Sequence, residues 1–130
     1  MIQRIQTVLL LLISIASALS LFYLPPLDFP ALGLPIPILL KSYLILTGFM
    51  AFLTLLIFKH RKTQLMMNRL HFFLQIAVAG VLIYGLSNAD DLNPFLFWLS
   101  MPFLVLILLI LSNRAIQKDE DLIRSIDRLR

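Results

Sequence analysis

Few side chains in this sequence have the chemistry for catalysis or ligand binding. The chain has no cysteine and only two histidines, His60 and His71, which excludes thiolate metal sites and cysteine nucleophiles. A haem or metal site would need both imidazoles to converge, yet His60 belongs to a charged loop and His71 is expected at the edge of an apolar segment. Asp90 and Asp91 lack further oxygen ligands, so they suit a helix cap better than a cation site. We therefore expect no catalytic residue, no metal and no cofactor.

Two polar residues within apolar segments remain as candidates. Gln75 is the deepest plainly polar side chain, and an unpaired amide in hydrocarbon costs several kcal/mol. We expect Gln75 to face other helices and to hydrogen-bond to one of them. Lys41 lies in the first turn of its segment, where its aliphatic stem can carry the ammonium group to the membrane interface. The apolar segments contain no acidic partner for Lys41, which argues against a role in a substrate path.

Composition indicates the setting in which these residues work. Hydrophobic residues make up 60% of the 130 residues and charged residues 14%, whereas a soluble domain is about 45 to 50% apolar. The mean hydropathy is +0.93. These values are typical of an integral membrane protein, and the lipid bilayer is its first expected partner.

Four apolar runs are long enough to cross a bilayer, which takes about 20 helical residues per crossing. They lie at about residues 5–24, 38–58, 70–86 and 95–111. The sequence therefore predicts an all-α fold, an integral membrane four-helix bundle of two transmembrane hairpins. Residues 1–112 form this domain, and residues 113–130 form a cytoplasmic C-terminal amphipathic helix. A cleaved signal peptide is a competing interpretation of the first run, because Ala16-Ser17-Ala18 fits the small-x-small cleavage pattern.

The basic residues predict the orientation. Lys59-His60-Arg61-Lys62 lies between the second and third runs, and of the 11 Lys and Arg residues only Lys41 falls on the other side. Positively charged loops stay in the cytoplasm, so both termini are predicted to be cytoplasmic. The net charge of +4 thus reflects topology, and no nucleic-acid partner is expected. An aromatic belt is predicted at the outer boundary, formed by Tyr23, Tyr43, Tyr84 and Trp98.

The C-terminal tail is the most polar stretch. Its apolar residues recur at helical spacing, namely Ile116, Leu122, Ile123, Ile126 and Leu129, and Glu120 precedes Arg124 by four residues. Acidic and basic residues nearly cancel, so adsorption to anionic lipid is not expected. Arginine makes planar bidentate contacts with carboxylates, and the candidate partner-binding residues are Arg124, Asp127, Arg128 and Arg130. The alternative is a salt-bridged continuation of the fourth helix.

Both ends of the chain carry a resemblance to a known family. The start Met1-Ile2-Gln3-Arg4-Ile5-Gln6-Thr7 and the end, with Lys118-Asp119-Glu120, Leu122, Arg124-Ser125 and Asp127-Arg128-Leu129-Arg130, resemble a family of small four-span inner-membrane proteins of bacteria. That family is classed as a domain of unknown function. The resemblance implies the fold and the bacterial inner membrane as location, and it brings no catalytic residues.

Three classes of function follow. The first is a non-enzymatic accessory, scaffold or interaction subunit of a larger inner-membrane complex, because the polar residues concentrate in the cytoplasmic ends. The second is a small oligomeric transporter or channel, by analogy with other four-span proteins, although coupled transport normally uses ionisable groups within the membrane. An integral membrane enzyme comes third, since acid-base and nucleophilic candidates are few. The expected protein partner is another membrane protein or a second copy of the chain.

Overall fold

A computed structural model describes residues 2–27, 33 and 35–130, with side chains from residue 5 onward. This part of the chain forms four helices, α1 (Ile2–Tyr23), α2 (Ile36–Leu56), α3 (Arg61–Ser87) and α4 (Asn93–Arg128). All four are long and apolar enough to cross a membrane. The outer loop between the first two predicted spans lies largely outside the described residues.

Proline residues explain several helix ends. Pro25 and Pro26 follow the end of α1 at Tyr23, where a ring in place of the N–H cannot continue the helical hydrogen bonds. Pro35 is the N-cap of α2, and α2 and α4 each have a proline in their first turn, where the missing N–H costs nothing. Pro102 lies inside α4, which nevertheless continues as one helix. At its start, the side chain of Asp91 accepts a hydrogen bond from the backbone N–H of Asn93 (3.1 Å).

Two helices are longer than the predicted spans. The span expected at 70–86 belongs to a helix that begins at Arg61, because residues 61–69 contain no proline or glycine and continue the helix. The span expected at 95–111 belongs to α4, which runs without a break to Arg128. The tail is therefore a continuation of the fourth helix and not a separate element.

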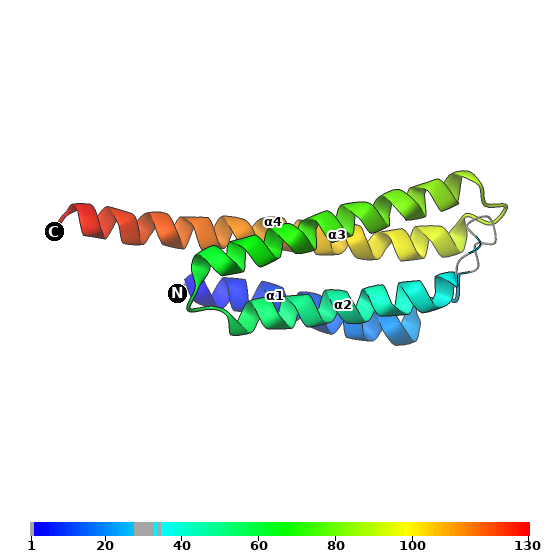
Figure 1. Ribbon diagram of the computed structural model, residues 1–130, viewed down its shortest axis with the longest axis horizontal. Helices are drawn as coiled ribbons and strands as arrows, with labels where there is room; N and C mark the ends of the chain where they lie inside the picture. Colours follow the sequence, from blue (N-terminus) through cyan, green and yellow to red (C-terminus); the bar gives the residue numbers. More distant parts are fainter. Residues whose placement is uncertain (1, 28–32, 34) are drawn as a thin grey trace.

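The helices form an antiparallel up-down-up-down bundle (Figure 1). The hairpins α1–α2 and α3–α4 are joined by extensive packing of α1 on α4, whereas α2 and α3 make the least contact of the neighbouring pairs. Both chain ends and the short α2–α3 connection lie at one end of the bundle, and α4 protrudes well beyond the other helices there. The bundle is consequently less closed between α2 and α3 than elsewhere.

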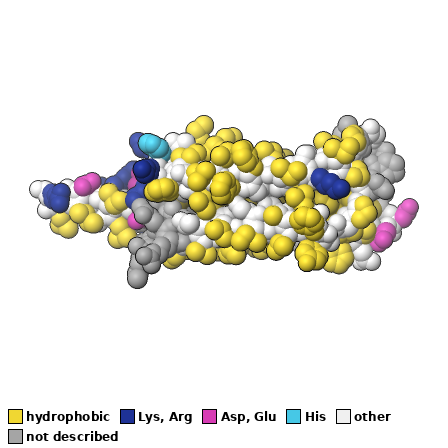
Figure 2. Space-filling model, turned by 90° about the horizontal axis from the view of Figure 1, so that it is seen from below, with side chains coloured by type: hydrophobic (Ala, Val, Ile, Leu, Met, Phe, Trp, Pro, Cys, Tyr) yellow, Lys and Arg dark blue, Asp and Glu magenta, His cyan; other side chains and the backbone are white. Residues whose placement is uncertain are grey.

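Charge follows the long axis of the bundle. Hydrophobic side chains cover its middle, and Lys and Arg side chains gather toward the end from which α4 protrudes (Figure 2). We call this the basic end, defined by Lys59, Arg61, Lys62, Arg69 and Arg114. The acidic pair Asp90 and Asp91 lies in the connection at the opposite end. Such a division into two polar ends and an apolar middle fits a bilayer.

The core is apolar along the α1–α4 interface, where Leu10, Ile13, Val105 and Leu109 are fully buried. Close approach of α1 and α2 occurs at Gly48, whose missing side chain makes room for Ser17. The hydroxyl of Ser14 donates to the carbonyl oxygen of Gly48 at 3.3 Å. Small residues at this crossing bring the two backbones together, as is common between membrane helices.

The predicted aromatic belt is wrong for two of its four members. Tyr43 and Trp98 are only 6% and 4% exposed and point into the bundle. Trp98 donates its indole N–H to the carbonyl oxygen of Pro25 (2.7 Å), which ties α4 to the end of α1. The Tyr43 hydroxyl and the Trp98 indole N–H thus form hydrogen bonds inside the protein and not with the membrane interface. Tyr23 and Tyr84 are exposed.

Candidate functional site

A stripe of buried polar side chains runs along α3. Gln64, Asn68, His71 and Gln75 are spaced by four, three and four residues, which places them on one helical face. Each is at most 2% exposed. The exposed positions of the same helix include Leu70, Phe73 and Ile76. This helix therefore buries polar groups and exposes apolar ones, the reverse of a helix on the surface of a soluble protein.

One end of the polar stripe joins α3 to α2. The hydroxyl of Tyr43 donates a hydrogen bond to Oε1 of Gln75, and Nε2 of Gln75 donates to Oγ1 of Thr47 at 3.1 Å. Tyr43 and Thr47 lie one turn apart on α2, so a single amide bridges both. Gln75 therefore lies inside the bundle and is hydrogen-bonded to a neighbouring helix. These hydrogen bonds link the neighbouring helix pair that makes the least contact.

The rest of the polar stripe joins α3 to α4. Nδ2 of Asn68 donates to Oδ1 of Asn113 at 2.8 Å. At the basic end, Arg61 forms an ion pair with Asp119 (2.8 Å), and both side chains are largely buried. Because Asp119 lies six residues beyond Asn113, these two contacts fix the register of α3 against α4 over nearly two turns.

Three residues of this region present polar atoms that have no hydrogen-bond partner among the described residues. They are Asn68 (Oδ1), His71 (Nδ1 and Nε2) and Ser112 (Oγ). The carbonyl oxygen is an acceptor, a hydroxyl is both donor and acceptor, and a neutral imidazole offers one of each. Unpaired buried groups of this kind complement water or another small polar molecule.

His71, expected at the edge of an apolar segment, is fully buried inside the bundle, on the same face of α3 as Asn68 and Gln75. His60 is exposed in the connection before α3, so the two imidazoles are in different environments. No group of three or more metal-ligating side chains occurs among the residues whose positions are described.

Sequence reasoning found Gln75 but missed the rest of the polar stripe. The signal was present as the helical spacing of Gln64, Asn68, His71 and Gln75. The third predicted span begins at about residue 70, so Gln64 and Asn68 lie outside it and their helical spacing with His71 and Gln75 led to no prediction. Ser112 and Asn113 were likewise placed at a span boundary, although both face α3 or the bundle interior.

The predicted partner-binding residues lie on the protruding part of α4. Residues 121–130 are all exposed. Arg124 forms an ion pair with Glu120 of the same helix (2.8 Å), so one nitrogen of its guanidinium group already binds a carboxylate. Asp127, Arg128 and Arg130 are exposed near the chain end, alongside the apolar side chains of Leu122, Ile126 and Leu129. The bundle itself does not cover this surface.

Comparison with known proteins identifies a family for most of the chain. Residues 35–129 match the model of the family described as Domain of unknown function (DUF4293). The match covers α2, α3 and α4, including the whole polar stripe of α3. No curated protein and no solved structure matches the chain.

Proposed function

The chain belongs to the DUF4293 family, a domain of unknown function, and we propose that it is a non-enzymatic accessory or scaffold subunit of a larger complex in the bacterial inner membrane. Its four helices cross the membrane, and both termini and the α2–α3 connection lie in the cytoplasm. The apolar middle of the bundle and the concentration of arginine and lysine at the basic end support this placement.

The proposal rests on the protruding part of α4. Residues 121–130 extend beyond the bundle and expose Leu122, Ile126 and Leu129 at helical spacing beside charged residues of both signs. An exposed helical face that combines apolar residues with arginine is typical of a protein contact. Near-neutral charge makes adsorption to anionic lipid weak. The partner is a membrane-associated protein whose acidic groups pair with Arg128 and Arg130.

We expect the order of residues in this segment to determine partner binding. The full-length tagged protein is compared with a deletion of residues 121–130 and with a scrambled version of the same residues that keeps helicity, and partners are recovered in mild detergent. Arg61, Asp119 and the bundle remain intact in both variants. Loss of the same partners from both variants, with unchanged protein level, is the expected result. Equal recovery with the scrambled segment contradicts the proposal.

The topology gives a separate prediction. Asn88 and Thr63 are both exposed, the first at the opposite end of the bundle and the second at the basic end. A cysteine at Asn88 is expected to react with a membrane-impermeant maleimide in intact cells, whereas a cysteine at Thr63 reacts only after permeabilisation. The chain has no native cysteine, so each label reports one position. The reverse labelling pattern rules out this orientation.

A second function, a small oligomeric transporter or channel, is favoured by one observation. Polar atoms of Asn68, His71 and Ser112 have no partner among the side chains that the structure describes, and ionisable residues within membrane helices commonly mark ion or substrate paths. The same purification separates the two functions. Reproducible protein partners support the scaffold, whereas a homo-oligomer alone supports the transporter.

A further inference from the structure

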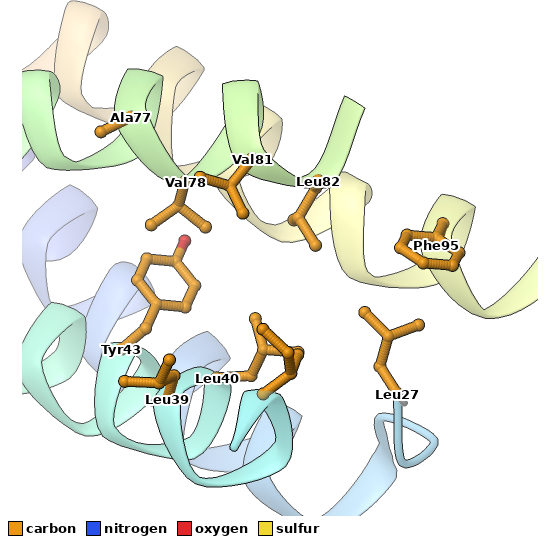
Figure 3. A pocket seen from close by; sticks show the side chains of 10 residues that line it. Leu27, Leu39, Leu40, Tyr43, Ala77, Val78, Val81, Leu82 and Phe95 are labelled. Carbon is orange, nitrogen blue, oxygen red and sulfur yellow. The ribbon is translucent and has the colours of Figure 1, made fainter. Parts of the chain in front are cut away.

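A cavity of about 270 Å³ lies between α2 and α3 in the half of the bundle away from the basic end (Figure 3). Its walls include Leu40 and Tyr43 of α2, Val78 and Leu82 of α3, and Phe95 of α4. Leu40, Tyr43, Leu82 and Phe95 are each at most 7% exposed. The cavity is therefore recessed within the fold and is distinct from the surface that any membrane helix offers to lipid.

The two ends of the cavity are closed by different side chains. Toward the middle of the bundle it ends at Tyr43, whose hydroxyl is bonded to Gln75. At the other end the ring of Phe95 rests where Gly85 has no side chain, and a Cβ at Gly85 would collide with that ring. The side opens between α2 and α3, where Val81 is 49% exposed. Entry is consequently lateral, from the surroundings of the apolar middle.

The lining selects among possible occupants. Water is disfavoured because, among the described residues that line the cavity, the only polar side-chain atom is the hydroxyl of Tyr43, which already has a partner, and apolar cavities of about 150 Å³ are known to stay dry and take up hydrocarbon. A helix about 10 Å across cannot enter a recess of about 270 Å³. A thin, flexible hydrocarbon chain fits both the volume and the lining.

The depth of the cavity agrees with such an occupant. Along α2 it extends from Ile36 to Tyr43, seven residues or about 10 Å. One half of a bilayer's hydrocarbon core is about 15 Å thick. A chain that descends from the interface at the start of α2 would thus have about two thirds of its length in the cavity, down to Tyr43, near the level where the polar stripe of α3 begins.

We propose that this cavity is a binding site for one acyl chain of a membrane phospholipid, taken from the leaflet at the end opposite the basic end. The inference rests on the membrane residence proposed above but not on the scaffold role. The acyl chain fills the space between α2 and α3, and Val81 lies at the lateral opening.

The only tryptophan of the chain provides the test. Trp98 lies one turn of α4 from Phe95 and is 4% exposed, so bulk lipid has little access to it. The full-length protein is reconstituted in phosphatidylcholine vesicles whose acyl chains carry bromine, a contact quencher of indole fluorescence. Bound lipid is counted in parallel by native mass spectrometry after purification with palmitoyl-oleoyl phosphatidylglycerol.

The matched variants are Val81→Phe and Ile83→Phe. Both positions are on α3 and 49% exposed, but only Val81 lines the cavity. We expect the wild type and Ile83→Phe to retain one phospholipid and to show strong quenching of Trp98, and Val81→Phe to lose both. Val78→Phe, which fills the cavity from within, should act in the same way.

Equal quenching and equal lipid retention in Val81→Phe and Ile83→Phe would overturn the proposal, as would a wild type that retains no phospholipid or only detergent. Membrane residence is checked separately, because all variants must still require detergent for extraction. Loss of lipid binding with retained extraction behaviour therefore tests the cavity alone. Circular dichroism shows whether a variant fails to fold. If Val78→Phe does not fold, the comparison of Val81→Phe with Ile83→Phe, both at exposed positions, tests the proposal.

Discussion

Replacing Gly48 by alanine is expected to destabilise the bundle by about 1 to 3 kcal/mol, the usual cost of overpacking. A Cβ at Gly48 would lie 2.6 Å from Oγ of Ser17 on α1, a separation that forces either the Ser17 hydroxyl to leave its hydrogen bonds to Ile13 and Ser14 or one of the two helices to shift. Reversible unfolding in mixed micelles, followed by the fluorescence of Trp98, measures the effect.

A second substitution tests the cause. The Ser17 hydroxyl bonds to carbonyl oxygens of its own helix, Ile13 at 2.9 Å and Ser14 at 3.0 Å, so its removal costs little. Cβ of Ser17 would be 3.6 Å from the new methyl group, an ordinary contact distance. Stability should therefore return in the double variant Ser17→Ala, Gly48→Ala.

The matched control is Gly80→Ala, because a Cβ at Gly80 meets no atom within 4 Å. This change in the middle of α3 should be neutral or stabilise the helix by up to about 1 kcal/mol. If Gly48→Ala is as well tolerated as Gly80→Ala, or if Ser17→Ala fails to restore the double variant, the close α1–α2 crossing does not limit stability.

Replacing Gln75 by leucine is expected to weaken the contact between α2 and α3. Leucine leaves the hydroxyls of Tyr43 and Thr47 without their partner. A buried polar group without a partner costs about 1 to 3 kcal/mol, and interhelical hydrogen bonds in membrane proteins contribute about 0.6 kcal/mol on average. We expect a loss of about 1 to 3 kcal/mol in the same unfolding measurement.

Two comparisons isolate the hydrogen bonds from the change in shape. Gln117→Leu removes an exposed amide on α4 and should leave stability nearly unchanged. The triple variant Tyr43→Phe, Thr47→Val, Gln75→Leu removes every member of the network and should regain most of the loss, because no unpaired group remains. A triple variant as unstable as Gln75→Leu would show that packing volume, and not hydrogen bonding, accounts for the effect.

The sequence by itself determined the class of fold. Four apolar runs of sufficient length, separated by Pro25-Pro26, by a charged connection and by an acidic turn before Pro94, can bury their backbone polar groups only as helices. The four helices and their order follow from this local information. So does the exclusion of Gln75 from lipid, because the cost of an unpaired amide does not depend on which helix supplies the partner.

Only the tertiary structure decided which polar residues are inside. Helical spacing places Gln64, Asn68, His71 and Gln75 on one face, but whether that face meets water, lipid or protein depends on how α3 packs on α2 and α4. Similarly, Tyr43 and Trp98 carry the residue types of an interface belt, yet Gln75 and the carbonyl oxygen of Pro25 hold them inside. Those partners are 32 and 73 residues away in sequence, and the cavity lies between α2 and α3, the neighbouring pair with the least contact. Contacts between such distant residues are set by the docking of whole helices, which no local pattern encodes.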